Sequence, residues 1–308
     1  MNQRILVTTS TFAVLDRAPV DLMEAAGYEV CLNPLKRRLS RSEITELFAD
    51  VEVVGLVAGL EPLDRKVLSQ SSLRVISRVG SGISNVDLDA ARDLGIAVHS
   101  TPDGPTSAVT ELTVGALLGL LREIPELNED LHAGRWVKRT GGQIEGRMVL
   151  VVGFGSIGAN VAKIFETLGA EVLVHDPYLS EGTCPYTVVS LSEGFAQADV
   201  ISFHNSGEEC LLKKKDLPRL KLGVLILNAA RGGVVSESAL LAGLERGIIG
   251  GAWLDVFVEE PYSGSLAGHK KVLLTPHVGS YTSECRTRME RHAVENLLAA
   301  LALIETAV

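Results

Sequence analysis

Three polar side chains with complementary chemistry, Arg231, Glu260 and His277, each follow a short apolar segment in the last third of the chain. Such segments are typical of buried strands, and in open α/β sheets ligands bind outside the carboxyl ends of the strands. A guanidinium, a carboxylate and an imidazole at such ends are suited to binding an acid and moving a proton. The pattern predicts a catalytic site for a substrate that carries a carboxylate.

A glycine-rich loop of the form Gly-x-Gly-x-x-Gly lies upstream, between an apolar segment and a helical pattern. In a dinucleotide site, Gly153 permits the tight turn, Gly155 lets the backbone approach the pyrophosphate, and Gly158 lets the helix pack closely on its strand. The amides of Ser156 and Ile157 are then expected to face phosphate at the helix N-terminus. The loop predicts a nucleotide-binding turn between a strand and a helix.

Asp176 closes the next predicted strand, roughly 20 residues past the loop, where an acid accepts hydrogen bonds from ribose hydroxyls. A carboxylate at this position repels a 2′-phosphate, so we expect NAD and not NADP as the cofactor. The alternative is a glycine-rich turn that binds nothing. That hypothesis is the weaker one, because the loop, the helix and the acid occur together.

Each of the three polar residues also has an ordinary explanation when it is taken alone. Arg231 precedes two glycines and would cap a turn, Glu260 follows another acid on a solvated surface, and His277 would satisfy a buried carbonyl. Their joint order downstream of a nucleotide loop favours a shared site. A Ser-His-Asp hydrolase is disfavoured because no Gly-x-Ser-x-Gly elbow occurs, and a metal site is disfavoured because the histidines lack zinc-ligand spacing.

Composition restricts the remaining classes of protein. With 308 residues and a net charge of −9, we expect two domains and no nucleic-acid partner, because affinity for phosphates depends on Lys and Arg. The apolar runs are shorter than the roughly 20 residues of a membrane helix. The start of the chain predicts a strand and not a signal peptide, and the four scattered cysteines favour reduced thiols in a cytoplasmic protein.

Short apolar segments alternate with helical patterns along the chain, which is typical of parallel sheets covered on both faces. We therefore predict the α/β class, with two Rossmann-like or flavodoxin-like parallel-sheet domains and a cleft between them. The expected strands are 5–8, 29–32, 53–57, 74–78 and 97–100 in the first series and 149–153, 171–175, 200–204, 224–228, 251–255 and 272–275 in the second.

The turn-rich segment Thr101–Pro105 separates the two series, and a helical pattern follows it. Another long helical pattern begins after Ser283, and we expect it to return and cover the first domain. Residues 1–101 with 282–308 are accordingly predicted to form the substrate domain, and residues 102–281 the NAD-binding domain.

Five motifs together resemble one known family, the D-isomer-specific 2-hydroxyacid dehydrogenases, which include phosphoglycerate, glycerate and formate dehydrogenases. The likeness extends over nearly the whole chain, and the motifs occur in the family's order. The resemblance implies an NAD-dependent enzyme that transfers a hydride between the nicotinamide and C2 of a D-2-hydroxy acid or 2-keto acid. It rests on residues 79–87, 153–158 with Asp176, 228–233, 254–261 and 275–279.

The resemblance also implies a role for each polar residue. Arg231 is expected to bind the substrate carboxylate and keto oxygen, because a guanidinium is a fixed two-pronged donor. His277 is expected to exchange a proton with the 2-oxygen, and Glu260 to bind the other ring nitrogen and favour the protonated ring. These three residues form the predicted catalytic set.

Further contacts are implied by position within the motifs. The amides around Gly80, Ser81 and Gly82 are expected to hold the substrate carboxylate, and Ser81 also to touch the cofactor. Asp255 is expected to bind the carboxamide of nicotinamide. The other implied cofactor contacts are His204, Ala229, Ala230 and Gly279, beside the loop residues Gly153, Gly155, Ser156, Ile157 and Gly158 and the acid Asp176.

Members of the family are typically dimers, so a homodimer is expected, with the apolar helix 109–121 as the candidate contact. Trp136 matches a position that in some relatives reaches the neighbouring subunit's site. An alternative function on the same fold is an NAD-sensing binding protein that resembles a transcriptional co-repressor. Arg231, Glu260 and His277 are compatible with both the dehydrogenase and the binding protein, so they do not distinguish the two functions.

One loop departs from the classic phosphoglycerate dehydrogenases, which carry an Arg-Ser pair after the third strand to hold phosphate. Here the segment is Ala58-Gly59-Leu60-Glu61, and Glu61 is expected to repel a phosphate. We therefore expect the substrate to be a 2-keto acid with an uncharged tail. A true 3-phosphoglycerate dehydrogenase is kept as the alternative. The segment 205–210 is also shorter than the usual loop beside the adenosine pocket, which predicts a more open cofactor edge.

Overall fold

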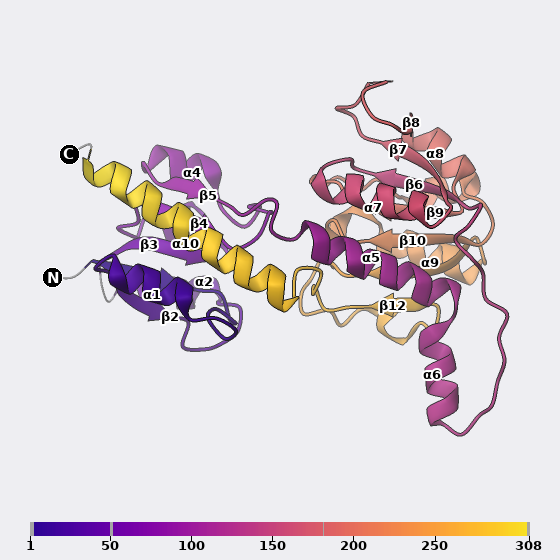
Figure 1. Ribbon diagram of the computed structural model, residues 1–308, viewed down its shortest axis with the longest axis horizontal. Coiled ribbons are helices and arrows are strands. Elements are labelled where there is room, and N and C mark those ends of the chain that lie inside the picture. The colour runs from indigo at the N-terminus through magenta and orange to yellow at the C-terminus, as the bar shows by residue number, and fades with distance from the viewer. Residues whose placement is uncertain (1–2, 50–51, 181, 307–308) are drawn as a thin grey trace. The chain divides into compact units, whose positions relative to one another are not determined.

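The computed structural model describes residues 3–49, 52–180 and 182–306. The chain forms two compact units (Figure 1). Unit 1 consists of Met1–Pro105 together with Ser280–Val308, and unit 2 of Thr106–Gly279. Unit 1 is therefore assembled from both ends of the chain, whereas unit 2 is one continuous stretch.

Unit 1 is built on a five-stranded parallel sheet in the order β2-β1-β3-β4-β5. The central strand β3 is buried along its whole length, as expected for a strand covered on both faces. Two short helices begin at aspartates whose carboxylates accept a backbone amide, Asp64 from Val67 and Asp87 from Ala90. The elements are β1 (Arg4–Val7), α1 (Ala18–Ala25), β2 (Glu29–Leu32), α2 (Arg41–Ala49), β3 (Val53–Ala58), α3 (Arg65–Leu68), β4 (Val75–Arg78), α4 (Leu88–Asp93) and β5 (Ala97–His99).

The long helix α10 (Ser283–Thr306) completes unit 1, as the sequence predicted, by packing on β3 and β4. Gly55 permits a close approach, because an added Cβ would lie 3.3 Å from the side chain of Leu297. A buried ion pair on the same helix joins Arg286 Nη2 to Glu290 Oε1 at 2.6 Å. Glu290 Oε2 also accepts the amide of Ala13 at 2.9 Å, which fastens the first loop to the helix.

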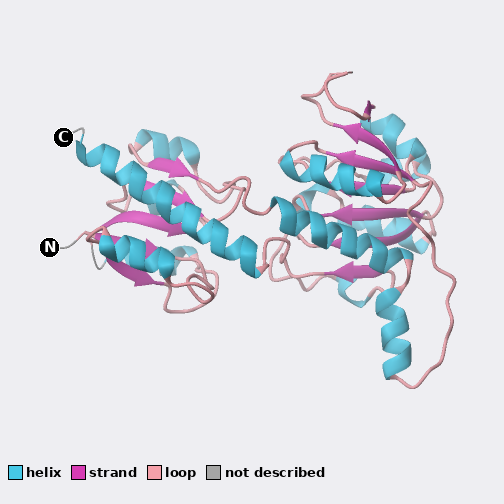
Figure 2. Ribbon diagram, viewed as in Figure 1, coloured by secondary structure: helices cyan, strands magenta, loops and turns pink. Residues whose placement is uncertain are grey.

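Unit 2 contains a seven-stranded parallel sheet in the order β12-β11-β10-β9-β6-β7-β8, flanked by helices (Figure 2). Alternate strand residues enter two separate apolar cores. Leu150, Ile201 and Ile226 belong to one, and Val149 and Leu227 belong to the other. The strands are β6 (Met148–Val152), β7 (Glu171–His175), β8 (Thr187–Val188), β9 (Val200–Phe203), β10 (Val224–Asn228), β11 (Ile249–Leu254) and β12 (Val272–Leu274).

The helices of unit 2 include the predicted helix after Pro105, which is observed as α5 and packs on α7 and on the sheet. The predicted α/β class with two parallel sheets is confirmed. The two-residue strand β8 was not predicted, because so short a segment carries no periodicity. The helices are α5 (Thr106–Leu121), α6 (Ile124–His132), α7 (Ser156–Thr167), α8 (Leu191–Gln197) and α9 (Glu237–Glu245), with 3₁₀ turns at Lys214–Arg219, Gly232–Val234 and Ser265–Gly268.

Candidate active site

The three predicted polar residues follow three neighbouring strands of the sheet in unit 2. Arg231 follows β10, Glu260 follows β11 and His277 follows β12. Because β10, β11 and β12 are adjacent and parallel, their carboxyl ends lie at the same edge of the sheet. This edge is where ligands bind in open α/β sheets.

His277 and Glu260 contact each other directly. The Nδ1 atom of His277 lies 2.9 Å from Oε2 and 3.1 Å from Oε1 of Glu260. Glu260 is itself oriented by the amide of Phe257, which donates to Oε1 at 3.1 Å. Both side chains remain partly exposed, 40% for His277 and 23% for Glu260. The carboxylate therefore holds one ring nitrogen, and Nε2 is the atom that is left to face a reactant.

The backbone at His277 has a left-handed conformation, with φ of 54°. A residue with a Cβ adopts this conformation only where its surroundings fix it. Here the fixed element is the buried carboxylate of Asp255, which accepts the amide of Val278 at 2.9 Å and the amide of Gly279 at 2.8 Å. The hydroxyl of Thr275 donates to the same carboxylate at 2.6 Å. Asp255 thus binds Thr275 before His277 and two amides after it, and so holds the loop that carries the imidazole.

A folded turn presents Arg231. The side chain of Asn228 accepts the amide of Ala230 and donates to the carbonyl of Arg231, both at 3.0 Å. Gly232 lies so close to Phe257 that an added Cβ would overlap the Phe257 backbone. The turn after β10 therefore packs against the segment after β11, which leads to Glu260.

The glycine loop has the close packing that its sequence predicted. Gly153 has φ of 91°, and an added Cβ there would lie 2.5 Å from the amide nitrogen of Asn205. An added Cβ at Gly158 would overlap the carbonyl oxygen of Gly153. In contrast, a Cβ at Gly155 would have no heavy atom within 4 Å. Gly153 and Gly158 are thus required by the fold, and Gly155 leaves open space at the N-terminus of α7, where a diphosphate fits.

Asp176 lies beside this loop, at the end of β7. Its Oδ2 accepts the amide of Phe154 at 2.8 Å, and its Oδ1 accepts the amide of Tyr178 at 2.9 Å. The carboxylate is therefore held at the mouth of the glycine loop in a fixed orientation. The predicted ribose acid and the predicted phosphate loop are brought together by this contact.

His204 follows β9, next to Gly153 in space. Its Nε2 lies 2.8 Å from the hydroxyl of Ser202, and burial lowers the pKa of His204 to about 3. Within the described residues, its buried Nδ1 has no hydrogen-bond partner. If the Ser202 hydroxyl donates to Nε2, Nδ1 carries the hydrogen and is a donor without an acceptor. Such an orphaned polar atom beside the glycine loop fits a cofactor that supplies oxygen acceptors.

Two predictions for unit 1 need correction. The amide of Gly80 donates to Thr101 Oγ1 at 2.8 Å, so it is already engaged and does not hold a carboxylate. Gly80 has φ of 135°, and an added Cβ would overlap the guanidinium of Arg78. Its positive φ is the reason that glycine is favoured here, because the guanidinium is the end of a flexible side chain. Ser81 and Gly82 lie at or near the surface of the same segment.

The second correction concerns Glu61, which was expected to repel a phosphate. Its side chain points into unit 1, with only 1% of the residue exposed. It lies 2.5 Å from the hydroxyl of Thr8 and accepts the amide of Gly59. Burial raises the pKa of Glu61, which favours the neutral acid. The carboxyl is therefore a structural group, and the argument against phosphate rests only on the missing arginine.

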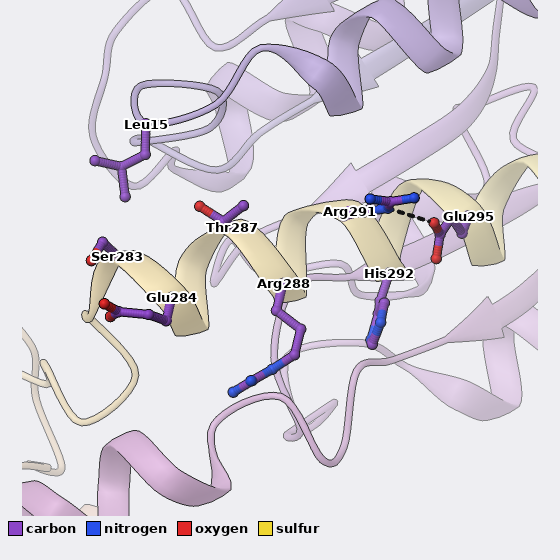
Figure 3. A pocket seen from close by; sticks show the side chains of 8 residues that line it. All are labelled: Leu15, Ser283, Glu284, Thr287, Arg288, Arg291, His292 and Glu295. Atoms are coloured by element: carbon purple, nitrogen blue, oxygen red, sulfur yellow. Dashed lines mark hydrogen bonds and ion pairs between the residues drawn. The ribbon is translucent and has the colours of Figure 1, made fainter.

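A cavity of about 750 Å³ on unit 1 contains none of these residues. Side chains of α10 line it, together with Leu15 (Figure 3). Two of its arginines are engaged, because Arg291 pairs with Glu295 at 2.8 Å and Arg288 donates to the carbonyl of Gly104 at 2.9 Å.

In the described part of the chain, no group of three or more His, Cys, Asp or Glu side chains has the arrangement of a metal site. Across the same residues, no helix is long and apolar enough to cross a membrane. All four cysteines are free thiols.

A dinucleotide-type loop and a His-Glu pair at one sheet edge define an α/β protein of the dehydrogenase type. The family described as "D-isomer specific 2-hydroxyacid dehydrogenase, NAD binding domain" matches residues 114–279. The chain belongs to the D-isomer-specific 2-hydroxyacid dehydrogenase family, as its motifs predicted.

Individual relatives agree with this assignment. A D-3-phosphoglycerate dehydrogenase of Synechocystis sp. is 30% identical over 303 residues, which cover 96% of this chain and 53% of that protein. A hydroxypyruvate reductase of Thermotoga maritima is 30% identical over 281 residues, which cover 88% of this chain and 92% of that protein. The chain spans about half the length of the phosphoglycerate dehydrogenases that it matches.

Solved structures also share the fold. The TT0316 protein from Thermus thermophilus has a TM-score of 0.88 at 33% identity, covering 97% of both chains. A glyoxylate reductase from Paecilomyes thermophila has a TM-score of 0.85 at 28% identity, covering 97% of this chain and 95% of that one.

Proposed function

We propose that this protein is an NAD-dependent dehydrogenase that interconverts D-2-hydroxy acids and 2-keto acids. The observation that carries the proposal is the His277–Glu260 pair, which lies on the same sheet edge as Arg231 and in the same unit as the glycine loop. The two compact units are proposed to be the substrate domain and the NAD-binding domain. The boundaries fall near residues 105 and 280.

Each catalytic group has a distinct task in keto acid reduction. Arg231 binds the carboxylate and the keto oxygen by its two-pronged donor set. Bound NADH supplies the hydride. His277 donates the proton from Nε2 to the 2-oxygen, while Glu260 holds Nδ1 and stabilises the charged ring. In hydroxy acid oxidation the same ring accepts the proton.

The residues around the glycine loop fit the dinucleotide. Gly155 leaves room for the pyrophosphate at the amides of Ser156 and Ile157, and Asp176 receives the ribose hydroxyls. Asp255 has three of its roughly four lone-pair sites occupied, which leaves one on Oδ2 for a carboxamide donor. The remaining proposed contacts are His204, Ala229, Ala230 and Gly279 for the cofactor, and Ser81 and Gly82 for the substrate carboxylate.

The preferred substrate is a 2-keto acid whose tail carries no phosphate. Arg231 accounts for one anionic group, and a second buried anion needs donors of its own. The loop Ala58-Gly59-Leu60 supplies no cationic side chain. Two neighbouring cations, Lys138 and Arg139, are the alternative phosphate contacts if they reach from a partner subunit, but Arg139 already pairs with Asp130 at 2.8 Å. The names of relatives as hydroxypyruvate and glyoxylate reductases also support a small substrate.

A turnover assay with NADH tests the function. Glyoxylate, pyruvate, hydroxypyruvate, bulkier 2-keto acids and 3-phosphohydroxypyruvate are compared at equal concentration. We expect reduction of at least one unphosphorylated acid, with His277→Ala lowering kcat by about two to four decades. NADH binding without turnover of any acid would instead support an NAD-sensing binding protein. A preference for 3-phosphohydroxypyruvate that is lost in Lys138→Ala would overturn the substrate proposal.

We further propose a cytoplasmic homodimer. The apolar residues of α5, the helix first expected at the interface, are largely buried in their own unit, Ala116, Leu117 and Leu121 among them. Exposed apolar side chains instead concentrate on α6 and the segment after it, where Trp136 is 81% exposed. A cluster of this kind marks a surface for a partner, here a second copy of the chain. The free thiols support a reducing compartment.

A further inference from the structure

A chain of hydrogen bonds runs from the core of unit 2 to the loop of His277. The indole nitrogen of Trp253 donates to Thr275 Oγ1 at 3.0 Å. The hydroxyl of Thr275 lies 2.6 Å from Asp255 Oδ1. Asp255 in turn accepts the amides of Val278 and Gly279, the two residues that follow His277. Five groups are thereby connected, from Trp253 on β11 and Asp255 just after it to the segment that follows β12.

The direction of every bond in this chain is fixed by chemistry. An indole N–H only donates, so Thr275 Oγ1 must accept from Trp253. The single hydroxyl hydrogen of Thr275 is then free to point only to the carboxylate of Asp255. Asp255 receives this hydrogen and two backbone amides, an arrangement that suits a carboxylate whose oxygens all act as acceptors.

Trp253 is wholly buried, at 0% exposure, within an otherwise aliphatic strand. A buried indole N–H without an acceptor is costly, so the side chain is anchored wherever its acceptor lies. That acceptor is Thr275, which directly follows β12 and precedes the His277 turn by two residues. The core of the unit therefore fixes the position of the Thr275 hydroxyl.

The His277 turn needs such an anchor. Its left-handed backbone at φ of 54° is unfavourable for a residue with a Cβ and persists only when neighbouring contacts fix it. The amide of His277 itself donates to the carbonyl of Thr275 at 2.9 Å. Gly279 also packs closely on this carboxylate, because an added Cβ would lie 2.9 Å from Asp255 Oδ2.

We propose that Trp253 and Thr275 are positioning residues for catalysis, which orient the Asp255 carboxylate and through it the His277 ring on Glu260. The proposal rests on the proposed function, in which His277 Nε2 delivers the proton. Neither residue touches substrate, so both act through the loop. Loss of either hydrogen bond leaves a buried donor or acceptor unpaired and releases the turn.

Three variants separate this role from simple packing. Thr275→Val keeps the shape of the side chain and removes the hydroxyl, Thr275→Ser restores the hydroxyl, and Trp253→Phe keeps an aromatic ring and removes the N–H. Thr167→Val is the matched control, because the exposed Thr167 hydroxyl donates to the carbonyl of Lys163 within its own helix. Trp136→Phe serves only as a background for spectroscopy, in which Trp253 is the sole tryptophan, since the chain has two.

Kinetics provide the first measurement. Thr275→Val is expected to lower kcat about tenfold, with KM for the keto acid within about twofold. The pH profile of reduction should move to lower pH, because the His277–Glu260 contact is loosened. Trp253→Phe should change the same quantities in the same direction, and Thr275→Ser should be close to wild type. Equal losses in Thr275→Val and Thr275→Ser would overturn the proposal.

Hydrogen exchange provides a measurement that does not depend on turnover. In the Trp136→Phe background, Thr275→Val should speed exchange of the Trp253 indole N–H and of the Val278 and Gly279 amides by about tenfold or more. Unchanged exchange at Val278 and Gly279 in a folded Thr275→Val protein would refute the positioning role. A wild-type protein that reduces no keto acid would refute the proposed function instead, and the exchange result would still decide whether the loop is anchored.

Discussion

Acidification is expected to destabilise unit 2 through His204. Burial lowers the pKa of this residue from 6.5 to about 3 in the folded protein. The folded value is the lower one, so the unfolded chain binds the additional proton as the pH falls. The stability that His204 contributes as a neutral ring is therefore complete above pH 6.5 and is lost progressively below it.

The magnitude follows from the two pKa values. At pH 5 the unfolded histidine is almost fully protonated and the folded one is almost fully neutral, which corresponds to a loss of about 2 kcal/mol. The loss arises because the ring stays neutral in the folded protein at pH 5, whereas the unfolded chain binds the proton.

Urea unfolding at pH 7.5 and pH 5, followed by the fluorescence of buried Trp253 in the Trp136→Phe background, measures this loss. His204→Gln retains a polar group opposite Ser202 and cannot titrate. The loss between the two pH values should therefore be about 2 kcal/mol smaller in this variant. His132→Gln removes an exposed histidine of the same unit and should leave the loss unchanged. Equal losses in His204→Gln and wild type would refute the reasoning.

Three further outcomes are expected. Glu260→Gln should bind NADH normally and move the pH profile of reduction toward lower pH, because the neutral amide no longer stabilises the charged ring; an unchanged profile removes Glu260 from the mechanism. Asp176→Ala should weaken NAD binding and improve NADP binding in calorimetry, and a wild-type protein that binds both cofactors equally would contradict the ribose argument. Gly158→Ala should destabilise unit 2 by about 1–3 kcal/mol in urea unfolding, because its methyl group overlaps the carbonyl of Gly153. A loss below about 0.5 kcal/mol would show that the loop relaxes.

The sequence predicted those parts of the site that depend on a short local motif. Gly153 allows a tight turn and Gly158 allows a close helix contact, and both depend on backbone geometry alone. The close approaches expected at these two glycines are observed. The shared position of Arg231, Glu260 and His277 was predicted because parallel strands bring their carboxyl ends to one edge. The direct contact between His277 and Glu260 was implied only by the family resemblance.

The parts that were missed depend on side-chain direction. Glu61 carries a charge in the sequence, yet its carboxyl turns toward Thr8 and is buried. The amide of Gly80 was expected to face substrate and is bound by Thr101 instead. The bond between Trp253 and Thr275 joins residues 22 apart in sequence and has no periodic pattern. A tryptophan in an otherwise aliphatic strand is a signal that could have indicated this bond.

The construction of unit 1 from both ends of the chain has a consequence for biosynthesis. Strands β1 to β5 leave the ribosome well before α10, which covers β3 and β4. Unit 2 lies between them and has all its strands in one continuous stretch, so it can close while the first sheet still lacks its cover. The interval is roughly 200 residues, which at about 5–20 residues per second lasts tens of seconds. During this time the nascent chain presents an uncovered apolar face of the first sheet while unit 2 is still being synthesised, so we expect chaperones that bind near the ribosome to recognise the first hundred or so residues.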